Sequence, residues 1–192
     1  MKITDECFGK VKQDCFKFIK SQETSTEKFK GKEKMLKSFL IPLCAWISKK
    51  ADKQNPYFLG LAGGQGTGKT TISSLISIIL KKYFKKNVFR VSIDDFYKTR
   101  KDRLKLSKSI HSMLMTRGVP GTHDLKLMQN FFKNVKQKSF RSIKVPKFDK
   151  SIDDRYPKKN WYNINKKPDI IIFEGWCVGA RSETNKTLKR SI

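Results

Sequence analysis

The sequence predicts an α/β fold, in which a mostly parallel sheet is flanked by helices and preceded by an N-terminal helical extension. A short apolar run at Tyr57–Ala62 is followed by a glycine-rich loop and then by apolar residues at three-and-four spacing from Ile72 to Tyr83. Two further apolar runs, Asn87–Ile93 and Asp169–Gly175, come later in the chain. Strands that alternate with helices in this order predict a parallel sheet with a right-handed crossover.

Two helices are expected before the first strand. Residues 1–22 place apolar side chains on one face, which predicts an amphipathic helix that packs on the domain. A membrane-surface helix has the same pattern but is the less common use. Residues 35–50 predict a second helix, which Pro42 kinks or divides, with Trp46 in the core.

The stretch between the second and third apolar runs is less regular. Residues 98–123 are basic, and we expect a helix near Ser109–Met115. Asp124 is typical of an N-cap for a helix at Leu125–Val135, and Ile143–Phe148 reads as another strand.

Length and composition favour one soluble domain. The 192 residues carry a formal net charge of +26, yet only eight of the 43 basic residues are arginine and the lysines are spread along the chain. Such a charge raises the possibility of a nucleic-acid partner, but a solvated lysine-rich surface is the interpretation we favour. Nucleic acid is therefore an unlikely partner.

The cysteines and the apolar runs indicate the compartment. Cys7, Cys15, Cys44 and Cys177 show no metal-binding spacing, so we expect reduced thiols. No apolar run approaches the roughly 20 residues that span a bilayer, and the N-terminus lacks an apolar signal core. We expect a cytoplasmic protein without a membrane partner.

The glycine-rich loop carries the clearest chemistry. It fits the phosphate-loop pattern of Gly, four residues, Gly-Lys-Thr, with a strand before it and a helix after it. Its backbone N–H groups and the helix N-terminus converge on phosphate oxygens, and a lysine and a hydroxyl can address the β- and γ-phosphates and Mg²⁺. We predict an ATP-type nucleotide site with Mg²⁺. Its residues are Gly63, Gly64, Gln65, Gly66, Thr67, Gly68, Lys69, Thr70 and Thr71.

Acidic residues follow the other two strands. Asp94 and Asp95 come after the second strand, and Glu174 ends the third. Ligands of such sheets lie at the carboxyl ends of the strands, so these acids are expected beside the phosphate loop. Glu174 is predicted to organise Mg²⁺ together with Thr70. Turn or cap chemistry remains an alternative for the Asp pair, as does a chance carboxylate for Glu174.

Further motifs carry a family resemblance. The segments S-I-D-D-F-Y, R-G-V-P-G-T-H-D, P-K-F-D-K-S, D-D-R and F-E-G-W-C-V-G-A follow the phosphate loop in order. Together they resemble the glycerate kinases of the D-glycerate 3-kinase type, in the branch of bacterial predicted kinases. These enzymes belong to the phosphoribulokinase and uridine kinase-like P-loop kinases. The resemblance covers residues 57 to 180.

This resemblance implies transfer of the ATP γ-phosphoryl group to a hydroxyl of D-glycerate, a small-molecule substrate. It implies that Asp94 is the base that accepts the hydroxyl proton, that Lys69 acts on the phosphates and that Glu174 orients Mg²⁺. It also implies an acceptor pocket around Asp94, Arg117, His123, Asp124, Asp149, Lys150 and Arg155. An arginine fork would suit the glycerate carboxylate.

The resemblance also sets the expected organisation. Residues 1–55 form the N-terminal extension and residues 56–192 the P-loop kinase domain. The family continues beyond Glu174 with further helices, so we expect this domain to be truncated at its C-terminal end. Its activity is then an open question, and the oligomeric state is not predicted.

Three alternatives stay open. One is a kinase of the same superfamily acting on a nucleoside, pantothenate or a sugar phosphate. Another is a nucleic-acid-associated ATPase, suggested by the charge of +26. The third is a non-catalytic nucleotide-binding remnant, suggested by the early C-terminus.

Overall fold

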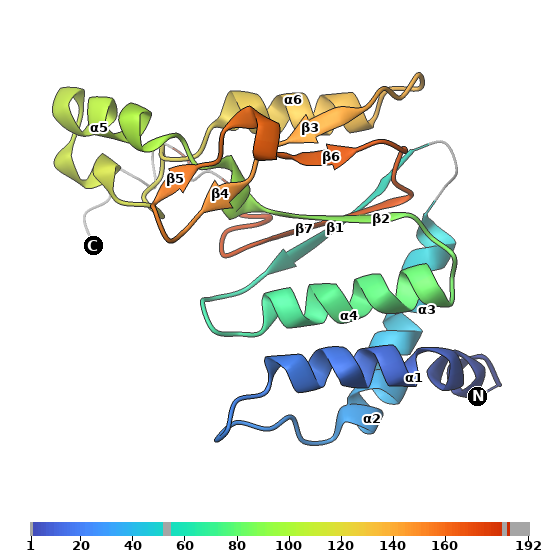
Figure 1. Ribbon diagram of the computed structural model, residues 1–192. Helices are drawn as coiled ribbons and strands as arrows, with labels where there is room; N and C mark the ends of the chain where they lie inside the picture. Colours follow the sequence, from blue (N-terminus) through green and yellow to red (C-terminus); the bar gives the residue numbers. More distant parts are fainter. Residues whose placement is uncertain (1, 52–54, 182–183, 185–192) are drawn as a thin grey trace.

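A three-stranded parallel sheet lies at the centre of the structure, a computed structural model that describes residues 2–51, 55–181 and 184 (Figure 1). Its strands are β1 (Tyr57–Ala62), β2 (Val88–Ser92) and β7 (Ile170–Gly175), in the spatial order β1-β7-β2. Both β1 and β2 run parallel to β7, as predicted. The register places Ala62 opposite Gly175 and Ser92 opposite Glu174, so the three carboxyl ends lie together.

Helices cover both faces of this sheet, and the central strand divides the core between them. Ile170 and Ile172 of β7 belong to one buried cluster, whereas Ile171 belongs to the other, because successive side chains of a strand point to opposite faces. The first cluster lies under α1, α3 and α4, and the second under α6, as Figure 1 shows. These helices are α1 (Lys2–Gln22), α3 (Ile41–Lys50), α4 (Lys69–Lys82) and α6 (Leu125–Val135).

The N-terminal helices pack on α4. The predicted helix over residues 1–22 is confirmed as α1, whose fully buried Val11, Cys15 and Ile19 form its inner stripe. The next helix is continuous but changes its winding, from α2 (Lys32–Met35) through a π-helical turn at Leu36–Leu40 into α3.

Pro42 explains the π turn. Proline has no backbone N–H to donate, and its ring would collide with the carbonyl four residues earlier in a regular α-helix. A wider turn just before the proline relieves both problems. The helix therefore continues through Pro42, and the π turn separates its two α-helical parts, α2 and α3.

The prediction that Trp46 lies in the core is wrong. Trp46 is 50% exposed, and its ring contacts Tyr57 edge to face with 6.3 Å between centroids and lies beneath the ammonium of Lys50. The buried stripe of this helix runs through Leu40, Cys44 and Ile47, and the tryptophan lies about 100° away from it around the axis.

The segment between β2 and β7 builds the end of the molecule at which the sheet strands terminate (Figure 1). The helix expected near Ser109–Met115 is misplaced: α5 spans Arg100–Ser109, and only a 3₁₀ turn covers Ser112–Met115. Apolar periodicity could not find α5, because its fully buried residue is Arg103. Thr99 begins the helix by accepting a hydrogen bond from the Asp102 N–H at 3.2 Å.

The helix α6 and shorter elements complete this segment, and α6 lies over one face of the sheet (Figure 1). The predicted helix at Leu125–Val135 is confirmed, with Asp124 accepting from the Leu127 N–H at 3.0 Å. The expected strand at Ile143–Phe148 is split into two. The remaining elements are 3₁₀ turns at Ile93–Phe96 and Lys158–Asn160, and strands β3 (Ile143–Val145), β4 (Phe148–Asp149), β5 (Asp154–Arg155) and β6 (Tyr162–Ile164). β3 pairs antiparallel with β6, and β4 with β5.

Across the described residues, no helix combines the length and apolar character needed to cross a membrane.

Candidate active site

The phosphate loop, Gly63–Thr70, joins β1 to α4 at the carboxyl end of the sheet. Its backbone needs glycine at Gly66 and Gly68, where φ is 75° and 77°. A Cβ on Gly63 would lie 2.9 Å from Thr67 Oγ1, so the first glycine of the motif is fixed by close packing within the loop. The loop has the curled backbone that a phosphate cradle requires.

Side chains close this loop on itself. Thr67 Oγ1 donates to the Gly64 carbonyl at 2.9 Å, and the ammonium of Lys69 donates to the same carbonyl. Lys69 begins α4, and Thr71 lies half-buried in its first turn, while Gln65 is exposed on the loop. The lysine charge and the helix N-terminus therefore address the same space over the loop.

Glu174 reaches this helix from the neighbouring strand. Its Oε1 accepts from Thr70 Oγ1 at 3.1 Å and its Oε2 from Ser73 Oγ at 2.9 Å. Hard oxygen donors of this kind fit Mg²⁺, which takes one or two carboxylates and completes its shell with phosphate oxygens and water. No group of three acidic, histidine or cysteine side chains gathers elsewhere in the described chain, so the protein offers no separate cage for the ion.

The adjacent acids Asp94 and Asp95 have opposite environments. The strand ends at Ser92, and Asp95 completes a capping box in which its Oδ2 accepts from the Ser92 N–H at 3.2 Å. Its Oδ1 accepts from the Phe148 N–H at 3.1 Å, and burial raises its pKa to about 6. Asp94 is partly exposed and forms an ion pair with Lys150 at 2.7 Å. One acid holds the backbone and the other is accessible.

His123 lies against the aromatic ring that follows this acid pair. It stacks on Tyr97 with 4.2 Å between centroids, and the two residues form an isolated antiparallel bridge. Burial lowers the pKa of His123, although the charge of Asp94 acts in the opposite direction. Its Nε2 atom is buried without a hydrogen-bond partner, which makes it an available polar atom near Asp94.

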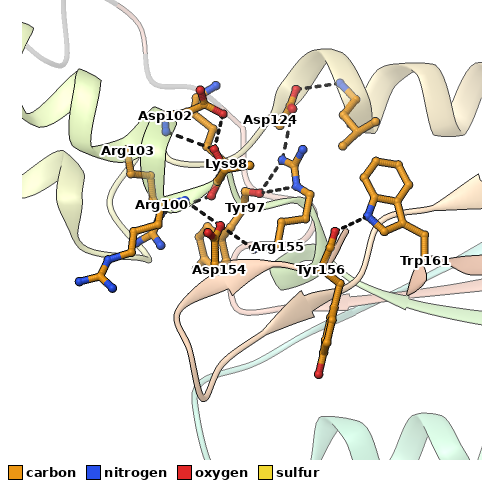
Figure 2. Close-up of polar contacts among 12 residues, drawn as sticks. Tyr97, Lys98, Arg100, Asp102, Arg103, Asp124, Asp154, Arg155, Tyr156 and Trp161 are labelled. Carbon is orange, nitrogen blue, oxygen red and sulfur yellow. Dashed lines mark hydrogen bonds and ion pairs between the residues drawn. The ribbon is translucent and has the colours of Figure 1, made fainter. Parts of the chain in front are cut away.

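Arg155 and Asp124 hold the backbone around Tyr97 (Figure 2). Arg155 donates to the Tyr97 carbonyl through Nε at 3.0 Å and Nη2 at 2.5 Å, and Nη2 also pairs with Asp124 Oδ2 at 3.2 Å. Asp124 in turn caps α6 through the Leu127 N–H. Both side chains thus hold the backbone that follows β2.

The β4–β5 hairpin carries two further predicted site residues. Asp149 accepts from the Ser151 N–H at 2.9 Å and the Ser151 hydroxyl at 2.6 Å, which ties the turn together. These bonds, with the hydroxyl of Ser151 as the largest cause, lower the pKa of Asp149 to about 2. Lys150 is 65% exposed and reaches from the turn to Asp94.

Arg117 joins the same hairpin through Asp153. Its Nε lies 2.8 Å from Asp153 Oδ1, and its guanidinium stands 5.4 Å from the Phe148 ring centroid. The fully buried Arg103 takes the other carboxylate oxygen at 3.0 Å and donates to the Met115 carbonyl at 2.7 Å.

Sequence reasoning missed three residues of this region: Ser73, Arg90 and Arg103. Ser73 lies four residues after Lys69, so helical spacing could have placed it on the same side of α4. The two arginines gave no signal, because nothing in a basic sequence marks which guanidinium is buried.

Comparison with known proteins also indicates a P-loop kinase. A model of the phosphoribulokinase / uridine kinase family matches residues 58–183. The probable ATP-dependent kinase TDA10 of Saccharomyces cerevisiae is 38% identical over 136 residues, which cover 65% of this chain and 46% of that protein. The chloroplastic D-glycerate 3-kinase of Arabidopsis thaliana is 30% identical over 161 residues, covering 74% and 35%.

A solved structure agrees with these relatives. The D-glycerate 3-kinase of Cryptococcus neoformans superposes with a TM-score of 0.63 and 29% identity, over 79% of this chain and 54% of that one. The chain thus spans about half or less of the length of these three relatives. The phosphate loop at the carboxyl end of a parallel sheet, the acid of β7 beside it and the matching family model lead to one conclusion. This chain belongs to the phosphoribulokinase / uridine kinase family of P-loop kinases.

Proposed function

We propose that this chain transfers the γ-phosphoryl group of ATP to a hydroxyl of D-glycerate. One observation carries the proposal. The accessible carboxylate of Asp94, at the carboxyl end of β2, pairs with the exposed ammonium of Lys150. A base and a cation side by side suit an acceptor that is both a hydroxyl and a carboxylate.

The nucleotide side of the site rests on the phosphate loop. When ATP binds, Lys69 would leave its hydrogen bond to the Gly64 carbonyl and neutralise the β- and γ-phosphates. Thr70 and Glu174 would hold Mg²⁺, which when bound offsets the charge of the transferring phosphoryl group. The loop amides and the start of α4 keep the phosphates in line with the acceptor.

The acceptor side uses the carboxyl end of β2 and the hairpin. Asp94 accepts the hydroxyl proton as the phosphoryl group is transferred. Lys150 exchanges Asp94 for the carboxylate of the acceptor, with Arg117 as a second cation close by on Phe148. His123 offers its Nε2, which has no partner among the described residues, as a hydrogen-bonding atom.

The remaining predicted acceptor residues have supporting roles in this proposal. Arg155 and Asp124 fix the backbone at Tyr97, and Asp149 shapes the hairpin turn that carries Lys150. Rigid support of this kind is what keeps a base and its acceptor within reacting distance.

Release of ADP from Mg-ATP, measured with separate acceptors, tests the proposal. The panel is D-glycerate, L-glycerate, uridine and pantothenate. We expect D-glycerate to give the highest kcat/KM. A preference for uridine or pantothenate would keep the kinase assignment and replace the acceptor, whereas ADP release that no acceptor stimulates would contradict acceptor phosphorylation by this chain.

A further inference from the structure

A relay of polar side chains that passes through the buried Ser73 connects Arg90 of β2 to Glu174 of β7, both of which are half-buried. Ser73 is fully buried on α4 and donates toward Glu174 Oε2 at 2.9 Å. Arg90 of β2 donates to Ser73 Oγ through Nε at 3.1 Å. None of these contacts follows from the phosphate-loop motif itself.

The proton count shows how the relay is oriented. A serine hydroxyl has one proton, and Ser73 has two acceptors in reach, Glu174 and the Thr70 carbonyl at 3.0 Å. That carbonyl lies within α4, where it serves the helix backbone, and it also accepts from Ser74 Oγ at 2.6 Å and from Arg90 Nη2 at 3.4 Å, so it already has several donors. The Ser73 proton is therefore left for the carboxylate, which is also the stronger acceptor.

The arginine enforces this orientation. A guanidinium can only donate, so Arg90 occupies a lone pair of Ser73 Oγ and directs the hydroxyl proton away from itself. Burial lowers the pKa of Arg90, and the charge of Glu174 acts in the opposite direction. Both oxygens of Glu174 are then fixed, one by Ser73 and one by Thr70.

We propose that Arg90, acting through Ser73, is a positioning residue that presents Glu174 to the Mg²⁺ of the bound nucleotide. The proposal rests on the proposed function, since it assigns Mg²⁺ to Thr70 and Glu174. Residues that hydrogen-bond to metal-organising carboxylates fix their orientation, and their loss typically lowers metal affinity about 10- to 100-fold.

The test is a Mg²⁺ titration of ADP binding, followed by calorimetry, with ADP affinity also measured in EDTA. Ser73→Ala and Arg90→Met should each raise the Mg²⁺ concentration at half-effect about 10-fold or more and leave ADP affinity in EDTA unchanged. The double variant should be no worse than the poorer single variant, because both residues act in one relay.

Two matched controls belong to this experiment. Ser77→Ala removes another buried hydroxyl from α4, and Lys81→Met removes another cation, in the last turn of that helix. Both should keep the wild-type Mg²⁺ dependence. If Arg90→Met fails to fold, Ser73→Ala still tests the proposal, because it removes a single hydroxyl group.

Two outcomes overturn this proposal while leaving the proposed function intact, and a third contradicts both. Unchanged Mg²⁺ dependence in Ser73→Ala would show that the relay does not position Glu174. An equal loss of ADP affinity with and without Mg²⁺ would make these residues structural supports of the nucleotide site. Wild-type protein that binds no ADP at all would contradict both the proposed function and this inference. The two failures are distinguishable, because in the first two outcomes the wild type still binds ADP.

Discussion

At the scale of single residues, the decisive contrast is between two neighbouring acids. Asp94 and Asp95 are alike in sequence, but the strand ends at Ser92 and the following 3₁₀ turn sends the two side chains into different surroundings. Asp95 accepts from two backbone N–H groups and is 9% exposed, whereas the side chain of Asp94 forms an ion pair with the exposed Lys150. We therefore propose Asp94, the accessible acid, as the catalytic one.

Asp94→Asn should lose most of kcat while ATP still binds. An amide cannot accept the acceptor proton, and removal of a general base typically costs about 10²–10⁴ in rate, or roughly 3–5 kcal/mol of barrier. The phosphate loop is untouched by the change, so the ATP Kd should stay near the wild-type value. Both constants are measured with the best acceptor of the panel.

Asp95→Asn is the matched control for that variant. It should reduce kcat less than Asp94→Asn does, since its expected lesion is structural: an amide nitrogen would face one of the two backbone N–H donors. A deeper loss of kcat in Asp95→Asn than in Asp94→Asn would move the base by one residue.

The same acid should leave a signature in the pH dependence of stability. Burial raises the pKa of Asp95 from 3.8 to about 6, so the folded state holds this proton more tightly than the unfolded state does. Its contribution to the free energy of unfolding is therefore greatest below about pH 4 and is lost as the pH rises through about 6.

Urea unfolding of the wild type and Asp95→Asn from about pH 4 to about pH 7 measures this contribution. The stability of the wild type relative to the variant should fall by about 1–3 kcal/mol over that range. A difference that stays constant with pH would show that Asp95 does not titrate with a raised pKa.

At the scale of elements, the junction of β1, the phosphate loop and α4 was predictable, because its signals are local. Apolar runs marked the strands, glycine and lysine spacing marked the loop, and Asp124 marked the start of α6. Elements stabilised by distant contacts were not predictable. The exposure of Trp46 depends on which face of α3 packs against the rest of the protein. The helix α5 is anchored by Arg103 rather than by an apolar stripe.

The candidate site follows the same division. Thr70 and Glu174 were predicted to meet, and they do so at 3.1 Å, because parallel strands bring their carboxyl ends together. The partners of Arg117 and Arg155 were beyond sequence reasoning, since a guanidinium finds carbonyls and carboxylates that lie close only after the hairpin has folded.

Lys69→Ala tests the element that carries the nucleotide. The lysine is the one side chain of the loop that can neutralise the γ-phosphate, so turnover should be nearly abolished. Within the described residues its ammonium bonds to a loop carbonyl alone, so the melting temperature should change little. Lys81→Ala, at the far end of α4, should keep wild-type turnover. Near wild-type turnover in Lys69→Ala would refute the role of the loop.

Arg103→Met tests how α5 is attached to the β4–β5 hairpin. Arg103 is fully buried and ion-paired with Asp153 at 3.0 Å, and its loss leaves that carboxylate and the Met115 carbonyl short of a donor. We expect the free energy of unfolding to fall by about 2–4 kcal/mol, discounted because Asp153 is partly exposed and keeps Arg117. Arg100→Met, an exposed neighbour on the same helix, should cost under about 0.5 kcal/mol. Equal effects of the two substitutions would contradict the anchoring role.

At the scale of the whole molecule, the parallel sheet divides the labour between its two sides. Glu174 bonds to Thr70 of α4, which lies on one side of the sheet in Figure 1, while Asp94 pairs with Lys150, which lies in the turn between β4 and β5. The formal net charge of +26 is spread along the chain and adds a general attraction for anions without defining a second site.

The central claim is that phosphoryl transfer to D-glycerate occurs at Asp94 with ATP on the phosphate loop. Transfer of radiolabelled γ-phosphate from ATP to D-glycerate, followed by separation of the product, tests it most directly. The wild-type protein should yield labelled phosphoglycerate in the presence of Mg²⁺, with the label lost in Lys69→Ala and reduced about 10²-fold or more in Asp94→Asn. Labelled inorganic phosphate with no labelled phosphoglycerate, or equal labelling by the wild type and Asp94→Asn, would contradict it.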